Sequence, residues 1–408
     1  MEFGWSEEQE VGYRQARAFA ERELDPRHSG ALGTTAAERF ARHWQACADF
    51  GVLGLNLPTR FGGLGLDTRS ALRVMEGLGR GTSDNGLLMA LGAQLWSVGE
   101  PILAFGDEEQ QQTWLPRLAR GTSIGAFALS ESEAGSDVFH LRTQAVADGG
   151  GWRLSGAKAF VTNAPVAEVF IIVASTDARA GYFGLTAFLV AAGQEGLSVS
   201  PAVEKMGLES SPMAEITLDG VFVPQGGVLG AVGGGAAVVQ HTLEWERGSL
   251  LAPALGTIAR LLERTTAHCR ERRQFGRPIA EFEAVGGLLA EVRLRLHLAR
   301  LAVYEFAWRK DQGLGATLEA AMVKLYLSES LRRAAEVALH LHGASGYMRA
   351  LDYEREWRDA MASSLYSGTT EIQRNLIAES LLHAAPDFRT APTPVPTSGA
   401  GGGEAVAA

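Results

Sequence analysis

Cysteine is scarce in this chain. Its 408 residues include only Cys47 and Cys269, which lie far apart and have no metal-ligand spacing around them. Two such residues make neither a disulfide scaffold nor a zinc site, and they are typical of a reducing compartment. We expect both thiols to be buried as small apolar groups, and we expect no bound metal.

Long basic runs and long apolar runs are also missing. Acidic residues outnumber basic residues by 47 to 37, which gives a net charge of −10 and argues against nucleic acid as a main partner. No apolar stretch approaches the length of a membrane span, and the N-terminal residues lack the basic and apolar pattern of a targeting signal. We expect a soluble, cytoplasmic protein that binds neither nucleic acid nor membranes.

The chain does have three consecutive sequence patterns. Residues 1–120 show helical periodicity and capping signals, such as Ser6-Glu7-Glu8. Across residues 124–232, short apolar runs alternate with glycine-rich turns, which predicts an antiparallel β domain with a hairpin turn at Asp219-Gly220. Long amphipathic segments over residues 235–384 predict a four-helix bundle.

We therefore expect an α+β multidomain protein, because 408 residues exceed one ordinary folding unit. The expected parts are an N-terminal helical domain over residues 1–122, a middle antiparallel β-barrel domain over 123–233, a C-terminal four-helix bundle over 234–385 and a disordered tail over 386–408. The tail is rich in Pro, Thr, Gly and Ala.

Two segments of the middle domain carry a specific pattern. Phe127-Ala-Leu-Ser-Glu-Ser-Glu-Ala-Gly-Ser-Asp137 begins as an apolar strand and ends in a turn. Its backbone N–H groups and hydroxyls can bind a flat heterocycle, and the turn can admit a phosphate or thioester arm; the alternative is a strand followed by an acidic loop. In the second segment, Gly156-Ala-Lys-Ala-Phe-Val-Thr-Asn163, the side chains of Phe160 and Thr162 share one face of a strand.

Together the two segments resemble the flavin-binding middle domain of the acyl-CoA dehydrogenase family. The resemblance implies FAD as the cofactor, and Phe160 keeps a stacking surface where many members have Trp. By analogy, residues 87–96 line the substrate pocket and Ser136 also contacts the substrate. The implied FAD contacts in this domain are Phe127, Leu129, Ser130, Gly135, Ser136, Phe160 and Thr162.

Three motifs near the C-terminus extend the resemblance: Arg272-Arg-Gln-Phe-Gly276, His340-Leu-His-Gly343 and Tyr366-Ser-Gly-Thr-Thr-Glu-Ile-Gln-Arg374. In the family the first of these reaches the FAD of a neighbouring subunit, which implies a homo-oligomer, either a dimer or a tetramer. His340 departs from the family pattern, which usually has Gln there. The implied further FAD contacts are Arg272, Gln274, Phe275, His340, Gly343, Thr369 and Glu371.

The position before Gly368-Thr369 is Glu in many members and serves as the catalytic base, but here it is Ser367. A lone serine is a poor proton acceptor at neutral pH. In isovaleryl-type members the base precedes an arginine near the start of the bundle, and Glu246 before Arg247 matches that position. The alternative for Glu246 is an exposed helix carboxylate beside Arg247.

The resemblance implies α,β-dehydrogenation of an acyl thioester, preferably acyl-CoA. Glu246 takes the α proton, the backbone N–H of Ser367 polarises the thioester carbonyl, and an electron-transfer flavoprotein or oxygen accepts the electrons. Further substrate contacts are Glu244, Arg247 and Gly368, although the first two could instead form a surface ion pair. Three alternatives stay open: dehydrogenation of a prolyl group on a carrier protein, a flavin-free subunit of a hetero-oligomer, and oxygen-using flavin chemistry.

The assignment of the base predicts the behaviour of Glu246→Gln. The variant keeps FAD, because the amide has the shape of the carboxyl group, but flavin reduction by an acyl thioester falls by about 10²–10⁴-fold because no group takes the α proton. Anaerobic stopped-flow absorbance measures this rate. Near-normal reduction in Glu246→Gln would show that the assignment is wrong.

Overall fold

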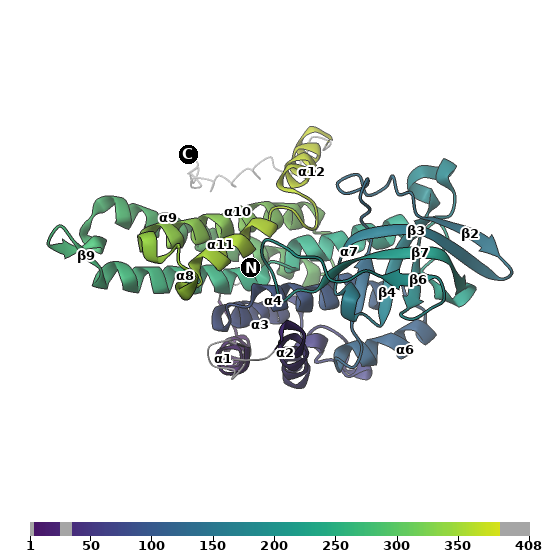
Figure 1. Cartoon of the computed structure of the whole chain (residues 1–408), viewed down its shortest axis with the longest axis horizontal. Helices are drawn as coiled ribbons and strands as arrows, with labels where there is room; N and C mark the ends of the chain where they lie inside the picture. The colour runs from purple at the N-terminus through teal and green to yellow at the C-terminus, as the bar shows by residue number, and fades with distance from the viewer. Residues whose placement is uncertain (1–3, 25–34, 384–408) are drawn as a thin grey trace, which may run out of the picture.

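The computed structural model describes residues 4–24 and 35–383, so the tail expected over 386–408 lies outside the described residues. The described chain forms an elongated body in which the β domain lies at one end of the long axis (Figure 1). C-terminal helices extend to the other end, and the N-terminal helices pack along one side of them (Figure 1). Both cysteines are buried, as expected.

The N-terminal domain is helical, and the capping signal predicted at Ser6 is confirmed. Ser6, Thr35 and Asp107 each form a capping box at a helix start. The last helix continues through Pro116 to Ala119, and the carbonyl of Pro116 accepts a hydrogen bond from the Arg120 N–H. The helices are α1 (Glu7–Phe19), α2 (Ala36–Phe50), α3 (Thr68–Gly81), α4 (Asn85–Gly92), α5 (Glu100–Phe105) and α6 (Glu108–Ala119), with π-helical segments η1 (Ala20–Leu24) and η4 (Ala93–Gly99).

The continuous helical run Asn85–Phe105, which comprises α4, η4 and α5, is long and apolar enough to cross a membrane. The expectation that no apolar stretch approaches this length is therefore wrong. Of its most apolar window, 83% is buried inside the protein. The run is apolar because both of its sides pack into the core.

The middle domain is one open sheet rather than a closed barrel. Within the described chain, the edge strands β6 and β8 do not pair with each other, and β1 pairs in parallel with β4. Both differences arise because alternating residue types reveal strands but not which strand edges meet. The strands are β1 (Gly125–Ala128), β2 (Gln144–Asp148), β3 (Gly151–Thr162), β4 (Val169–Ser175), β5 (Leu185–Ala191), β6 (Leu197–Val199), β7 (Met213–Pro224) and β8 (Val228–Leu229), in the order β6-β7-β3-β2-β4-β5-β8.

The hairpin expected at Asp219-Gly220 is also wrong, because both residues lie inside β7. Pairing of β3 with β7 shifts at this point, where Leu154 faces Val221 but Gly156 faces Leu218. Gly220 has a φ of 66°, a conformation that glycine adopts without strain, so the dipeptide forms a bulge in a long strand.

The C-terminal domain is helical, with six helices in the described chain rather than the four expected. α10 lies at its centre and packs against each of the other five helices. A short hairpin of β9 (Arg273–Gln274) and β10 (Arg277–Pro278) joins α8 to α9. The helices are α7 (Gly235–Ser249), α8 (Ala252–Glu271), α9 (Glu283–Asp311), α10 (Thr317–His342), α11 (Tyr353–Ala362) and α12 (Thr370–His383).

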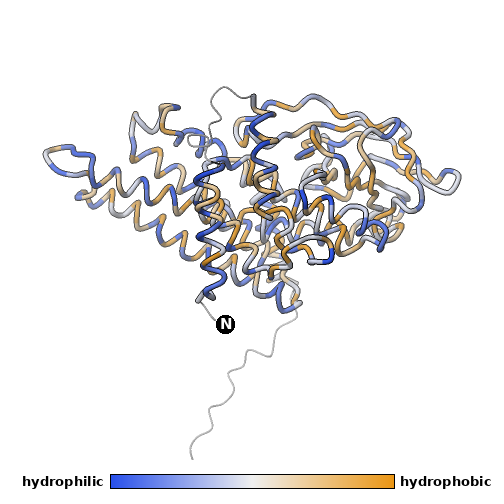
Figure 2. Tube along the Cα trace, turned by 90° about the horizontal axis from the view of Figure 1, so that it is seen from below, coloured by the Kyte–Doolittle hydropathy of each residue, from blue (hydrophilic) through white to orange (hydrophobic). Residues whose placement is uncertain are grey.

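One buried core joins the two helical domains, and it includes residues of α1–α4 as well as α7–α10. In Figure 2 the hydrophobic residues concentrate on the helix faces that point into the body. α3 and α8 approach so closely that a Cβ atom on Gly79 would lie 1.9 Å from the Pro253 carbonyl oxygen. The close approach fixes the N-terminal helices, including the run that contains η4, against the C-terminal domain.

Gly79→Ala tests this close approach. The added methyl group must push α3 from α8, and we expect a loss of about 1–3 kcal/mol and a lower melting temperature. Gly286→Ala is the matched control, since a Cβ atom added to this residue of α9 would have no neighbour within 4 Å, and it should leave stability unchanged or raise it by up to about 1 kcal/mol. Equal melting temperatures for both variants would contradict the packing argument.

Candidate active site

Glu246 lies near the C-terminal end of α7 and is half-buried. Its Oε1 accepts a hydrogen bond from Ser97 Oγ at 2.7 Å, and its Oε2 accepts one from Ser367 Oγ at 2.6 Å. Three elements that are distant in the sequence therefore meet at one carboxylate: α7, the π-helical segment η4 and the turn before α12.

Ser367 reaches Glu246 from an unusual backbone conformation. Ser367 has a φ of 55° and Gly368 has a φ of 91°. A serine rarely adopts this left-handed region, and such strain is found most often at functional sites. Arg247 Nε donates to the Ser367 carbonyl oxygen at 3.3 Å and Gln373 Nε2 to that of Gly368 at 2.9 Å, so surrounding side chains hold the turn.

Burial raises the pKa of the Glu246 carboxyl above its ordinary value. Hydrogen bonds from Ser367 and Ser97 oppose this shift, as do the positive charges of Arg247 and Lys324, but burial dominates. A carboxylate with a raised pKa is a stronger base than an exposed one, and the two hydroxyls fix its direction.

Ser97 was not among the predicted site residues. The segment expected to line a pocket, residues 87–96, ends one residue before it. In the sequence Ser97 looks like a lone small residue on an apolar core helix. A π-helical segment is frequently found at functional sites, but its irregular hydrogen bonding is visible only in the structure.

Glu244 lies on a different side of α7. It forms an ion pair with Lys310 Nζ at 2.9 Å and accepts a hydrogen bond from Thr317 Oγ1 at 2.5 Å. Burial would raise its pKa, but these two hydrogen bonds and the charge of Lys310 lower it instead. Glu244 is therefore bound to α9 and α10 and is not brought to Glu246, whereas Arg247 is, through the Ser367 carbonyl.

Five of the seven predicted flavin contacts of the middle domain, all except Gly135 and Ser136, lie at the end of β1 or on β3. The Ala159 N–H of β3 donates to the Ser130 carbonyl oxygen at 2.9 Å, next to Phe160. The side chain of Phe160 is 66% exposed. Leu129 is buried; Phe127, Ser130 and Thr162 are half-buried; Gly135 and Ser136 are exposed.

The helical run that contains Ser97 also holds these strands in place. Gln94 Oε1 accepts a hydrogen bond from the Gly125 N–H of β1 at 2.8 Å, and Asn163 Nδ2 donates to the Ala90 carbonyl oxygen at 3.1 Å. The strand edge formed by β1 and the end of β3 and the carboxylate of Glu246 are therefore positioned by the same helical run.

The other predicted cofactor contacts fall into two groups. Arg272, Gln274 and Phe275 are exposed on the β9–β10 hairpin, at the opposite end of the long axis from β1–β7 (Figure 1). His340 and Gly343 are exposed at the C-terminal end of α10. Neither of these sets meets the strand edge within one chain. Thr369 is half-buried and Glu371 exposed, and both lie within four residues of Ser367.

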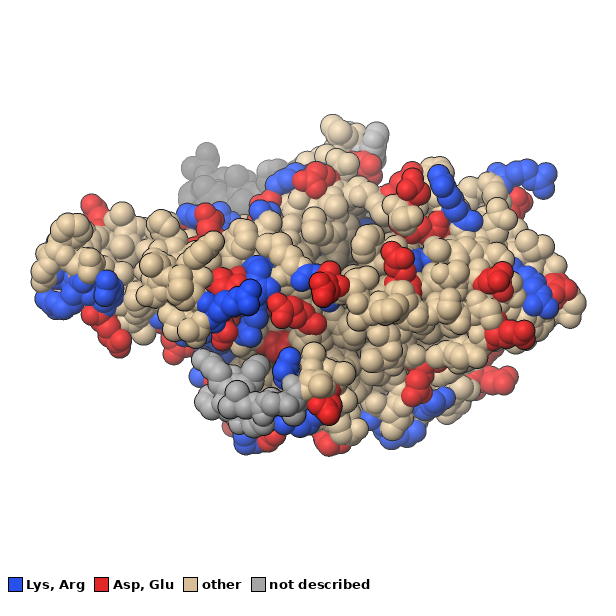
Figure 3. All heavy atoms as spheres, viewed as in Figure 1, with Lys and Arg blue, Asp and Glu red and all other residues tan. Residues whose placement is uncertain are grey.

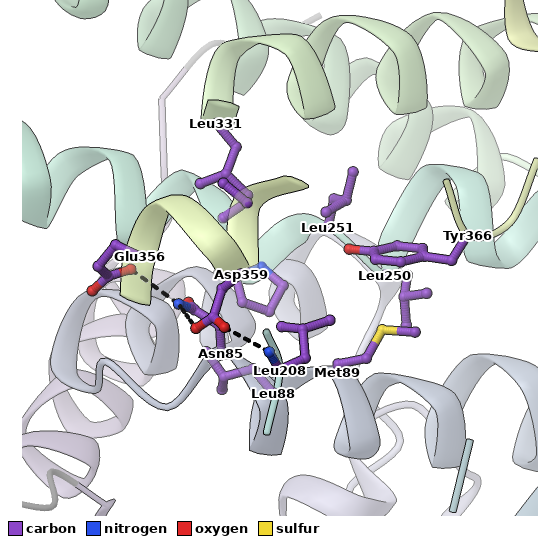
Figure 4. Close-up of a pocket in the computed structure, with 13 residues that line it drawn as sticks. Asn85, Leu88, Met89, Leu208, Leu250, Leu251, Leu331, Glu356, Asp359 and Tyr366 are labelled. Carbon is purple, nitrogen blue, oxygen red and sulfur yellow. Dashed lines mark hydrogen bonds between the residues drawn. The ribbon is translucent and has the colours of Figure 1, made fainter. Parts of the chain in front are cut away.

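A pocket lies beside Tyr366, the residue before Ser367 (Figure 4). Its apolar wall includes Leu88 and Met89 from the expected wall segment, together with Leu250. Its far end is polar, and burial raises the pKa of Asp359 there to about 6. The full lining is Asn85, Leu88, Met89, Leu208, Leu250, Leu251, Pro253, Ala254, Leu331, Glu356, Asp359, Ala360 and Tyr366.

The residues fit an FAD molecule by their chemistry. Phe160 has an exposed aromatic ring on β3, the strand that also carries Thr162, and the neighbouring Ala159 pairs with Ser130, so an aromatic side chain and two hydroxyl residues lie on adjoining segments, which suits a flat heterocycle with polar edges. Arg272 on the hairpin offers an exposed guanidinium group to a phosphate. Among the described residues no group of three potential metal ligands was found.

Comparisons with known proteins agree along the whole described chain. Family models match at residues 6–122 (acyl-CoA dehydrogenase, N-terminal domain), 126–221 (middle domain) and 233–382 (C-terminal domain). An L-prolyl-[peptidyl-carrier protein] dehydrogenase of Pseudomonas fluorescens is 38% identical over 84% of this chain and 90% of its own length.

Solved structures give the same picture. The prolyl acyl carrier protein oxidase AnaB is 40% identical, with a TM-score of 0.89 over 93% of this chain and 100% of that one. The structure of PigA with FAD and proline is 34% identical, with a TM-score of 0.88 over 93% of this chain and 99% of that one.

Burial of Glu246 predicts how stability changes with pH. Because its pKa is raised on folding, the folded protein holds the proton to a higher pH than the unfolded chain, and stability is lost as pH rises from the unfolded pKa of about 4.3 to the folded one. Glu246→Gln does not titrate. Its free energy of unfolding should therefore rise relative to that of the wild type as pH increases from 4 to 8, by about 1.4 kcal/mol for each unit of pKa elevation, and its melting temperature should rise in parallel.

Glu195→Gln is the matched control, because Glu195 is exposed in a turn and no ion pair is found for it in the described chain. Thermal melts of the flavin-free protein at several pH values make the comparison. A Glu246→Gln advantage that is the same at pH 4 and pH 8 would contradict the burial argument.

Proposed function

The chain belongs to the acyl-CoA dehydrogenase family, FAD-dependent oxidoreductases that act on CH–CH bonds, and we propose that it desaturates an acyl thioester between its α and β carbons. The observation that carries this proposal is the half-buried carboxylate of Glu246, held through both oxygens by Ser97 and Ser367. Glu246 occupies the position of the base in isovaleryl-type members.

Glu246 is the group that takes the α proton. Burial makes it a stronger base, and the two serine hydroxyls keep the carboxylate in one orientation. When bound, FAD supplies the acceptor for the β hydride. When Glu246 accepts the α proton of the substrate it becomes neutral, and its buried surroundings favour this neutral form.

The backbone N–H of Ser367 is the donor to the thioester carbonyl. In the described chain it donates to no protein acceptor, and it belongs to the residue that follows Tyr366, which lines the pocket. A preorganised donor of this kind is worth about 3–4 kcal/mol in the transition state. Ser367 thus has two roles, since its side chain binds the base and its backbone polarises the substrate.

Two thioester carriers are candidates. Coenzyme A is the carrier that the family name implies. A carrier protein bearing a prolyl group is favoured by the relatives at 38% and 40% identity, whose names specify prolyl carrier substrates. In Figure 3 acidic and basic side chains are interspersed over this face, with basic side chains at the β9 end, near the middle and at the β-domain end.

A homo-oligomer, as either a dimer or a tetramer, is part of the proposal. The exposed Arg272, Gln274 and Phe275 lie far from the strand edge of their own chain, so a second copy must supply them if both sets bind one FAD. Phe275 is 93% exposed, which suits a residue that a neighbouring subunit covers. A monomeric mass for the FAD-bound enzyme by light scattering would contradict this.

We also propose domain boundaries at 122/123 and 233/234 and a cytoplasmic location, with an electron-transfer flavoprotein or oxygen as the electron acceptor. The boundaries are supported by the change from helix to strand between Ala119 and Gly125 and from strand to helix between Leu229 and Gly235.

The proposed function is tested by anaerobic bleaching of the bound flavin. Purified protein should be yellow, and its flavin should lose absorbance with acyl-CoAs or with prolyl-loaded carrier protein, whichever carrier is correct. Oxygen uptake separates desaturation from oxygen-using flavin chemistry. A colourless protein, or a yellow one that no thioester bleaches, would contradict the proposal and favour a non-catalytic subunit.

A further inference from the structure

Lys324 is a fully buried lysine in the N-terminal third of α10, with 0% of its surface exposed. Its Nζ donates to the Ser363 carbonyl oxygen at 2.6 Å and lies 5.0 Å from the centre of the Tyr366 ring. In the described chain it forms no ion pair. Burying an ammonium group without a paired carboxylate costs free energy, so Lys324 is a candidate for a functional role.

The charges that face Lys324 come from α7. The positive charge of Lys324 lowers the pKa of Glu246, and the negative charge of Glu246 raises the pKa of Lys324, so the two groups are coupled without direct contact. Arg247 opposes the Lys324 charge, and burial is the largest influence, bringing the pKa of Lys324 to about 7. The ammonium form of Lys324 is therefore present below about pH 7, the range in which a carboxyl group titrates.

Lys324 also touches the turn that presents Ser367. Its partner Ser363 begins this turn, and Ser363 Oγ donates a hydrogen bond to the Ala360 carbonyl oxygen at 2.6 Å. Tyr366, over whose ring the ammonium lies, precedes Ser367, whose hydroxyl binds Glu246. Both ends of the segment from Ser363 to Ser367 are therefore in contact with either Lys324 or Glu246.

We propose that Lys324 is a positioning residue for the base. Its ammonium group contacts the Ser363–Ser367 turn, holds this turn in the conformation that orients Glu246, and supplies the positive charge that keeps Glu246 ionised. This inference rests on the proposed role of Glu246 as the base. It assigns a role to a residue of α10 that contacts neither the carboxylate nor the pocket lining other than Tyr366.

Lys324→Met tests the charge, because Met has a similar length and fills the cavity without an ammonium group. Without the positive charge the pKa of Glu246 rises, so the base stays protonated to a higher pH. The acid limb of the pH profile for flavin reduction should move up by about one pH unit, which is roughly tenfold slower reduction at pH 6 and little change at pH 9. Lys324→Arg, which keeps the positive charge, should bring the acid limb of the pH profile at least part of the way back to its wild-type position.

Lys205→Met is the matched control. Lys205 Nζ also donates to a backbone carbonyl oxygen, that of Ser211 at 2.8 Å, but the acidic groups that influence it are Glu209 and Asp359 rather than Glu246. Its pH profile should match that of the wild type. If Lys324→Met slows reduction by the same factor at every pH, or leaves the profile unchanged, Lys324 is only structural and the inference is wrong.

A second measurement needs no turnover and no change at Lys324. Coupling is reciprocal, so Glu246→Gln should lower the pKa of Lys324. The chain has only four lysines, Lys158, Lys205, Lys310 and Lys324, so ¹³Cε-lysine spectra of wild type and Glu246→Gln can be assigned and titrated. An unchanged Lys324 titration would overturn the inference even if Lys324→Met fails to fold.

The two proposals fail in distinguishable ways. If Glu246→Gln reduces its flavin normally, the proposed base is wrong whatever Lys324 does. If Glu246→Gln loses reduction but neither the pH profile of Lys324→Met nor the titration of Lys324 moves, Glu246 remains the base and only the role of Lys324 falls.

Discussion

The site depends on one arrangement, a carboxylate withdrawn from water and held by two hydroxyls. Ser97 and Ser367 bind separate oxygens of Glu246, and each belongs to an element that would be displaced if its packing changed. η4 is fixed by the shared core of the two helical domains, and the turn at Ser367 is fixed by Arg247 and Gln373. The positions of Ser97 and Ser367 relative to Glu246 therefore depend on packing contacts in both helical domains.

Local features of the fold could be predicted well, because they depend on neighbouring residues. The caps at Ser6, Thr35 and Asp107 are side-chain bonds to backbone groups three residues away, and sequence spacing reveals them. Sheet topology could not be predicted in this way. The parallel pairing of β1 with β4 and the bulge at Gly220 depend on contacts between distant segments, which periodicity does not encode.

The same distinction applies to the site. Glu246 was predicted because the absence of Glu at position 367 required another base, and Ser367 because its motif was recognisable. Ser97 and Lys324 have no such motif, and each looks like an ordinary member of a helix face. Their roles follow only from folding, which brings Ser97 within 2.7 Å of Glu246 and buries Lys324 behind the turn.

The distribution of lysine has a chemical consequence. Lys158 and Lys324 are buried, while Lys205 and Lys310 are half-buried and bonded to Ser211 and Glu244. Thioesters acylate free amines, and a guanidinium group, which stays protonated, does not compete as a nucleophile. With its exposed positive charge carried by arginine, an enzyme that works among activated acyl groups offers them almost no side-chain amine to modify.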